Sequence, residues 1–168
     1  MRIKTSITFK EYCKLIFALI YSGIILKIIV SVGIAMLLWI LGYYLHFLPV
    51  PKPEIYQYIA LILIAVVQPS GIFWLIKRNY NSNNHLTELL DIYITSHEFN
   101  ISGKTFYTEL VWENIFKVEE KKNYFLVYLN TLSAIIISKN DLKNTEVIEL
   151  KNILSTIPNI PVQLITKL

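Results

Sequence analysis

Two long apolar segments, neither containing a charged residue, dominate the pattern of hydrophobic and polar positions. The first covers Ile28–Phe47 and the second covers Ile55–Ile76, and a connector with three prolines, Phe47–Glu54, joins them. A helix needs about 20 apolar residues to span a bilayer, and both segments are that long. Buried helices of a soluble core are the alternative, but soluble helices of this length usually carry a charged face. The pattern therefore predicts a transmembrane helical hairpin over residues 28–78.

The basic residues that flank the hairpin predict its orientation. A first span that included Lys27 would place this charge near the bilayer centre, so we expect the span to begin at Ile28. Seven basic residues precede or follow the hairpin, whereas only Lys52 lies in the connector. Since positive flanks stay in the cytoplasm, we expect a multi-pass protein of the cytoplasmic membrane with both termini cytoplasmic. The seven are Arg2, Lys4, Lys10, Lys14, Lys27, Lys77 and Arg78.

Polar and small residues interrupt the second span at Gln68–Gly71. Pro69 removes a backbone hydrogen bond, so we expect a kink there. The small residues Ser and Gly after this proline are expected to let the two helices approach closely, with Gly33 and Ala35 facing them. A role for Gln68–Ser70 beyond helix packing is left open.

Apolar and polar residues alternate in the N-terminal segment Arg2–Phe9. This pattern predicts a short strand that can pair with a sheet edge. Thr8 and Glu11 match a capping box, and the helix that follows is expected to run unbroken into the first span. A secretory signal peptide over residues 1–26 is an alternative, but no small-residue cleavage pattern follows it. Cys13 is the single cysteine and forms no internal disulfide.

The hydrophobic period changes after a polar, turn-prone hinge at residues 79–84. Apolar and polar residues alternate in several short segments between residues 90 and 138, which is typical of half-buried strands. A helical period follows from Asn144 and ends at Pro158, and Pro161 predicts an extended tail. The sequence thus predicts an antiparallel sheet of about six strands closed by a C-terminal helix.

The predicted fold class is a membrane α-helical hairpin plus an α+β domain with the pleckstrin-homology-like (PH-like) order of elements. Trp112 is expected in a strand, on the face that the helix residues Leu150, Ile153 and Leu154 cover. The predicted organisation is an N-terminal cytoplasmic strand and helix (1–27), a hairpin (28–78), a hinge (79–84) and a cytoplasmic PH-like domain (85–168).

The strands of this domain resemble a known family. The run 106–128 holds a Trp before an apolar Ile and the strand Tyr-Phe-Leu-Val-Tyr, and Ala134–Lys139 ends the next strand. These motifs resemble the YcxB-like proteins over residues 99–157. The resemblance implies a bacterial membrane protein with two spans followed by a small PH-like domain, and it implies no activity. Ser138 stands where the family pattern has proline, which leaves this strand end less rigid.

Charge is distributed unevenly along the chain, whose net charge is +4. Residues 1–78 carry +6, mainly in the membrane flanks, and residues 79–168 carry −2. A slightly acidic domain argues against nucleic-acid binding. A lipid-headgroup site needs a basic cluster, and two neighbouring glutamates dilute the only candidates, so a solvated hairpin is the favoured interpretation. These weak candidates are Lys117, Lys121 and Lys122.

No pattern of catalytic, cofactor-binding or metal-binding residues stands out. His46, His85 and His97 are scattered without metal-ligand spacing, and no glycine-rich phosphate loop is present. A membrane enzyme or transporter is disfavoured because neither span holds a charge. We therefore expect no enzyme activity, no cofactor and no metal.

The favoured function is a membrane-anchored PH-like interaction or signalling module. The alternative is a peripheral lipid-headgroup-binding domain tethered at the cytoplasmic membrane surface. The expected partners are the lipid bilayer and an unidentified protein, and homo-oligomerisation through the hairpin is left open.

Overall fold

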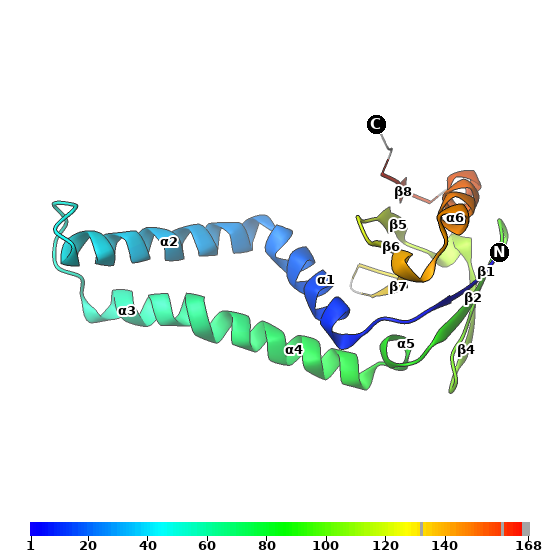
Figure 1. Ribbon diagram of the computed structural model, residues 1–168, viewed down its shortest axis with the longest axis horizontal. Coiled ribbons are helices and arrows are strands. Elements are labelled where there is room, and N and C mark those ends of the chain that lie inside the picture. Colours follow the sequence, from blue (N-terminus) through cyan, green and yellow to red (C-terminus); the bar gives the residue numbers. More distant parts are fainter. Residues whose placement is uncertain (132, 159, 166–168) are drawn as a thin grey trace. The chain divides into compact units, whose positions relative to one another are not determined.

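The computed structural model describes residues 1–131, 133–158 and 160–165. The chain divides into two compact units (Figure 1). The helical unit is Phe9–Tyr80, and the β unit combines Met1–Thr8 with Asn81–Leu168. The β unit is therefore assembled from two separate parts of the chain, with the helical unit inserted between them.

The helical unit begins with two helices and not with one. Gly23, with an extended backbone (φ −66°, ψ 142°), separates α1 (Phe9–Ser22) from α2 (Ile24–Tyr44). The Ser22 hydroxyl also donates to Leu19 O (2.7 Å) at the end of α1. The expectation of an unbroken helix into the first span is wrong, because a Ser-Gly pair favours a break.

Two helical stretches have the length and composition to cross a membrane. They are α2 and Ile55–Ser82, and they overlap the two apolar segments of the sequence. α2 begins at Ile24 and so includes Lys27, whereas the sequence predicts a span that begins at Ile28. The second stretch comprises α3 (Ile55–Ile62), a π-helical turn (Leu63–Val67) and α4 (Gln68–Ser82).

The π-helical turn lies directly before Pro69, where the sequence predicts a kink. The N–H of Gln68, the residue after this turn, donates to Leu63 O, which is five residues back instead of four. Pro69 has no N–H to donate, and its ring crowds the carbonyl four residues earlier. The proline is therefore accommodated by one wide turn inside a continuing helix.

Gly33 lies at a close contact between α2 and the second stretch. A Cβ atom at Gly33 would lie 2.9 Å from Ile64 Cγ2, so a larger residue forces a shift. A Cβ atom at Gly71 would have no neighbour within 4 Å, and Ala35 is exposed. The predicted contact of Gly33 and Ala35 with Ser70 and Gly71 is therefore wrong. Gly33 does lie at a helix contact, but opposite Ile64, and Ser70 is exposed.

The polar segment at residues 79–84 is mostly helical. α4 continues to Ser82, and α5 (Asn84–Thr87) begins two residues later. Between them, the Asn83 side chain accepts a hydrogen bond from the His85 N–H (3.0 Å). This cap satisfies an otherwise free N–H of the new helix, so the chain breaks at Asn83 only.

The β unit contains two four-stranded sheets, with orders β1–β2–β3–β4 and β7–β6–β5–β8. Neighbouring strands are antiparallel except β5 and β8, which are parallel. The expectation of one antiparallel sheet is wrong, because a 3₁₀ turn at Trp112–Asn114 separates β4 from β5. The strands are β1 (Arg2–Thr5), β2 (Leu90–Ile94), β3 (Glu98–Ser102), β4 (Tyr107–Val111), β5 (Lys117–Glu120), β6 (Tyr124–Tyr128), β7 (Ala134–Ser138) and β8 (Val162–Gln163).

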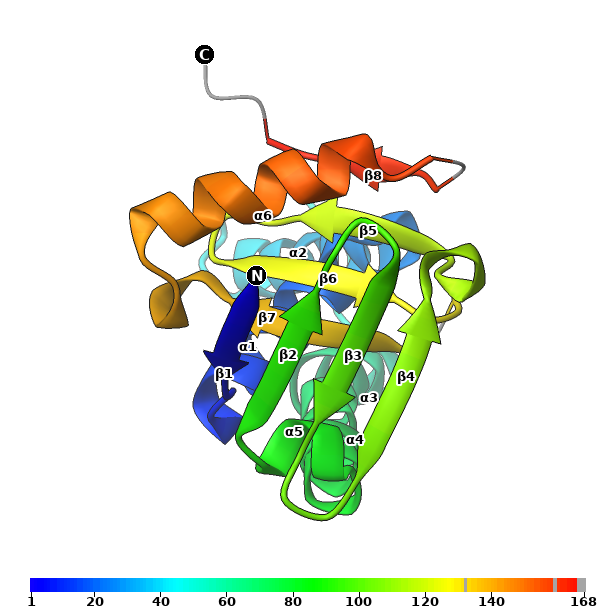
Figure 2. The same cartoon turned by 90° about the vertical axis from the view of Figure 1, so that its right-hand side faces the viewer.

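The strands of the two sheets cross at a steep angle in Figure 2, and a shared core includes residues of both sheets. Leu150 and Leu154 of α6 (Asn144–Thr156) are buried in this core. Trp112 is buried there too, although it lies in the 3₁₀ turn and not in a strand as predicted. Its Nε1 donates to Thr95 O (2.9 Å), and its ring stacks on Phe99 with 5.3 Å between centroids.

Candidate interaction surface

The sheet β1–β4 buries one face in the core and exposes the other. Because side chains alternate along each strand, every second residue points away from the core. We call this second set the outer sheet face. It consists of Arg2, Lys4, Asp91, Tyr93, Glu98, Asn100, Ser102, Tyr107, Glu109 and Val111.

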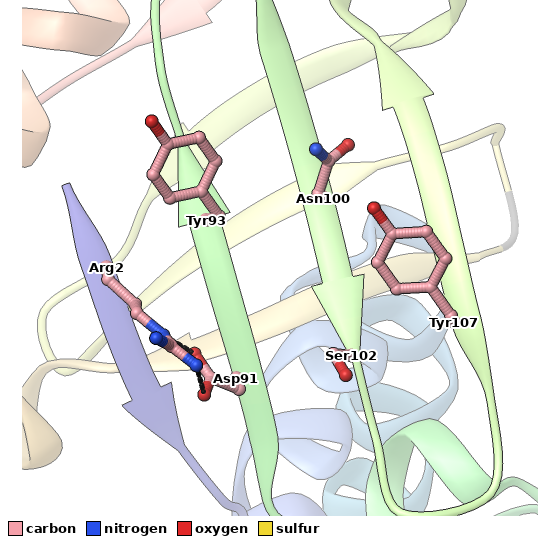
Figure 3. Close-up of a pocket in the computed structure, with 6 residues that line it drawn as sticks. All are labelled: Arg2, Asp91, Tyr93, Asn100, Ser102 and Tyr107. Atoms are coloured by element: carbon pink, nitrogen blue, oxygen red, sulfur yellow. Dashed lines mark hydrogen bonds and ion pairs between the residues drawn. The ribbon is translucent and has the colours of Figure 1, made fainter.

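A shallow hollow of about 420 Å³ lies on the outer sheet face. Figure 3 shows its six lining residues, which come from all four strands. Strand register brings Asn100 opposite Tyr93, and both aromatic rings of the hollow are well exposed, Tyr93 at 47% and Tyr107 at 60%. The hollow therefore offers aromatic surface together with hydrogen-bonding groups, as interaction surfaces often do. Its lining residues are Arg2, Asp91, Tyr93, Asn100, Ser102 and Tyr107.

A two-pronged ion pair joins β1 to β2 at one side of this hollow. Arg2 Nε and Nη2 donate to the two carboxylate oxygens of Asp91 at 2.8 and 2.7 Å. The hydrogen bonds from Arg2 lower the pKa of Asp91. Because the Arg2 side chain is 72% exposed, the pair adds little stability, and its main effect is to hold the two side chains in place.

The opposite side of the outer sheet face is acidic. The Tyr107 hydroxyl donates to Glu109 Oε1 (2.9 Å), and this hydrogen bond raises the pKa of the tyrosine. Glu98 lies on the neighbouring strand β3, and the sequences of β3 and β4 contain no Lys or Arg. The face is therefore polarised, with Arg2 and Lys4 on β1 and two carboxylates on β3 and β4.

The lysines predicted as headgroup candidates surround a carboxylate. Lys117 and Lys121 lie 2.6 and 2.9 Å from the two oxygens of Glu119. Hydrogen bonding from Lys117 lowers the pKa of Glu119, and Lys117 also lies over the Tyr128 ring, 4.5 Å from its centroid. Lys122 is exposed at the turn. The structure thus brings two of the three together, but their charges face a carboxylate within the protein.

Glu120 forms a buried cluster that the sequence analysis did not identify. Its side chain is 2% exposed, and Oε1 lies 2.5 Å from Lys139 Nζ and 2.8 Å from Lys151 Nζ. Its Oε2 accepts the N–H of Ile165 (2.7 Å). The sequence signal for burial of Glu120 is its position two residues after Val118, because alternate residues of a strand share a face. The cluster connects β5, α6 and the C-terminal segment, so its role is structural.

His85 is half-buried and packs on Phe106 with 4.0 Å between ring centroids. Burial lowers its pKa. In the described part of the chain, no three His, Cys, Asp or Glu residues lie together as a metal site would require.

Comparison with known proteins adds one match. The model of the YcxB-like protein family matches residues 94–154, from the end of β2 into α6, so the resemblance is confirmed over this segment. No curated protein and no solved structure matches the chain.

Proposed function

We propose that the chain, whose residues 94–154 match the YcxB-like family, is a membrane-anchored interaction module without enzymatic activity. The two apolar helical stretches anchor it in the bilayer. The β unit presents the outer sheet face to a protein partner. The observation that carries the proposal is the exposed hollow between Tyr93 and Tyr107 on this face.

The order of strands supports a PH-like β unit. Four antiparallel strands form one sheet, three further antiparallel strands form most of a second, and a helix with a buried apolar stripe follows. The hairpin is then an insertion after the first strand of the domain.

The distribution of basic residues supports a cytoplasmic location for the β unit. Seven Lys and Arg residues flank the chain ends of the hairpin and one lies in the connector. Both ends of the helical unit continue into the β unit, at Thr8 and at Asn81. A cytoplasmic β unit therefore requires both flanks on the same side.

The ion pairs that the candidate lysines form argue against the lipid-headgroup alternative. A headgroup phosphate attracts unpaired cations, but Lys117 and Lys121 already pair with Glu119. Lys122 remains exposed, and one lysine makes a weak phosphate site.

Site-specific photocrosslinking in intact membranes tests the proposal. A photoreactive amino acid at Tyr93 or Tyr107 of the full chain should give a discrete protein adduct. The same group at Ile148, an exposed apolar residue on α6 (59%), and at Lys122 should not give that adduct. Lipid adducts alone at Tyr93 and Tyr107, or equal protein adducts at all four positions, would overturn the proposal.

A further inference from the structure

β4 is an edge strand of the sheet β1–β4, because among the described residues it pairs only with β3. An edge strand leaves alternate N–H and C=O groups unpaired, so it can pair with an added strand. Its sequence, Tyr-Thr-Glu-Leu-Val, contains no proline and no lysine, which are the residues that commonly block such pairing. β1, the other edge, carries Arg2 and Lys4 outward.

The surface along β4 is acidic. Glu109 lies on β4, Glu98 on its neighbour β3, and Glu113 follows in the 3₁₀ turn, and all three are exposed. Among the described residues, none of these carboxylates takes part in an ion pair. This edge is therefore electrostatically complementary to a basic segment.

A second hollow, of about 320 Å³, lies where β4 ends. Val111, the last residue of β4, belongs to its wall, together with the carboxylate residue Glu113 and the aromatic residue Trp112. His97 in the turn between β2 and β3 and the end of α6 complete it. The apolar part of this lining, from Val111, Trp112 and Ile157, suits the stem of a Lys or Arg side chain, and the Glu113 carboxylate suits its cationic head.

Resting on the proposed function, we propose that β4 binds an extended basic peptide, which joins the sheet as a fifth strand. The backbone of the peptide pairs with the free edge of β4. Every second side chain of the peptide points to the outer sheet face. Lys or Arg residues two positions apart on this side therefore meet Glu109 and Glu98. One further Lys or Arg enters the hollow beside Glu113.

The length of the edge sets the length of the peptide. Tyr107–Val111 contains five residues, and its first and last Cα atoms lie about 13 Å apart at a rise of roughly 3.3 Å per residue. Reaching Glu113 adds two positions. A peptide of seven to nine residues therefore covers the edge and the hollow, as estimated from this rise.

The test uses the full chain in nanodiscs of neutral phosphatidylcholine and a fluorescent peptide of alternating Lys and Thr. Fluorescence anisotropy should show salt-sensitive binding, and hydrogen exchange of the β4 amides should slow when the peptide is bound. A peptide with Glu in place of Lys should not bind. A peptide in which one central Lys and the adjacent Thr are both N-methylated on the backbone should bind at least about tenfold more weakly, because adjacent strand residues point their N–H groups to opposite sides and one of the two must face β4.

Charge-reversal variants locate the site. Glu109→Lys should raise the Kd of the Lys–Thr peptide by about tenfold or more, whereas Glu149→Lys, at an exposed acid on α6, should leave it within about twofold. Both variants are at exposed positions, and circular dichroism confirms their folding. Equal effects of the two reversals, or equal binding of the N-methylated peptide, would overturn the inference.

Failure of this inference is distinguishable from failure of the proposed function. Absence of peptide binding with the Tyr107 protein adduct retained overturns strand addition alone. Absence of both the peptide binding and the Tyr107 protein adduct overturns the proposed interaction surface itself.

Discussion

Lys151 Nζ lies 2.8 Å from Glu120 Oε1 and thereby joins α6 to β5 through a carboxylate that is almost fully buried. Lys139 and the Ile165 N–H bind the same carboxylate, so one side chain connects three parts of the β unit. Removing one partner of such a cluster leaves the others without a counter-charge in a poorly solvated place. The cluster is therefore a sensitive point for stability.

Replacement of Glu120 by glutamine should destabilise the β unit. Glutamine keeps the shape but loses the charge-assisted hydrogen bonds, for an expected cost of about 1.5 to 3 kcal/mol. Chemical unfolding of the full chain in detergent, followed by tryptophan fluorescence, measures this cost. Glu149→Gln on the exposed side of α6 is the matched control and should change the free energy of unfolding by less than about 0.5 kcal/mol. Equal costs for both variants would contradict the prediction.

Protonation of Glu120 in this cluster should contribute to the pH dependence of stability. Burial raises the pKa of Glu120, but hydrogen bonds from Lys139, Lys151 and Ile165 outweigh burial, and the pKa lies below its ordinary value of 4.5. A lowered pKa in the folded state stabilises the protein above pH 4.5, and this contribution is lost as the pH falls through the folded-state pKa. Denaturant titrations at a series of acidic pH values should show a smaller acid loss of stability in Glu120→Gln than in the parent chain. Parallel pH profiles of the two proteins would argue against the assignment.

Trp112 should contribute to stability through both its ring and its indole N–H. Trp112→Ala removes a buried aromatic side chain and should cost about 3 to 5 kcal/mol. Trp112→Phe keeps a ring but leaves Thr95 O without its donor, so an intermediate loss of about 1 to 3 kcal/mol is expected. Thermal unfolding by circular dichroism ranks the variants, with Lys122→Ala at an exposed turn as the neutral control. A phenylalanine variant as stable as the parent would show that the hydrogen bond is unimportant.

The two glycines of the hairpin should respond differently to enlargement. Gly33→Val forces its new atoms against Ile64, and overpacking typically costs about 1 to 3 kcal/mol. Gly71→Val meets open space and should be tolerated. The midpoint of thermal aggregation in detergent, measured by size-exclusion chromatography after heating, should fall for Gly33→Val only. Similar midpoints for both variants would remove Gly33 from the helix contact.

The β unit should fold without the helical unit only if β1 is supplied. β1 pairs with β2 over four residues, and Ile3 is buried in the core. Residues 81–168 alone should therefore be poorly folded. The same segment preceded by Met1–Thr8 and a short Gly/Ser linker should give dispersed amide NMR signals. A well-folded 81–168 fragment would show that β1 is dispensable.

Both termini should lie in the cytoplasm. Single cysteines introduced at Lys52 and Lys122 of a Cys13→Ala chain give the test, because Lys52 lies in the connector and Lys122 in the β unit. A membrane-impermeant maleimide added to intact cells should label the cysteine at position 52 only. Labelling at position 122 in intact cells would reverse the orientation.

The sequence by itself determined the helical hairpin and most strand positions. Ile28–Phe47 and Ile55–Ile76 are apolar on every face, and this property belongs to the segment alone. The alternation along β2, β3 and β4 is also local, because each residue's inward or outward direction follows from a period of two. The terminal strands β1 and β8 were likewise predictable from alternation and from Pro161.

Only the tertiary structure decided how these elements combine. Alternation of apolar and polar residues indicates which face of a strand is buried but not which strands are neighbours. The division into two sheets depends on the turn at Trp112–Asn114, which only the structure shows. The partners of Glu120 are 19, 31 and 45 residues away in the chain, and no local pattern marks them. The polarised outer sheet face has the same origin, because Arg2 and Glu109 share a row only after the N-terminal strand β1 pairs in register with β2, far away in the sequence.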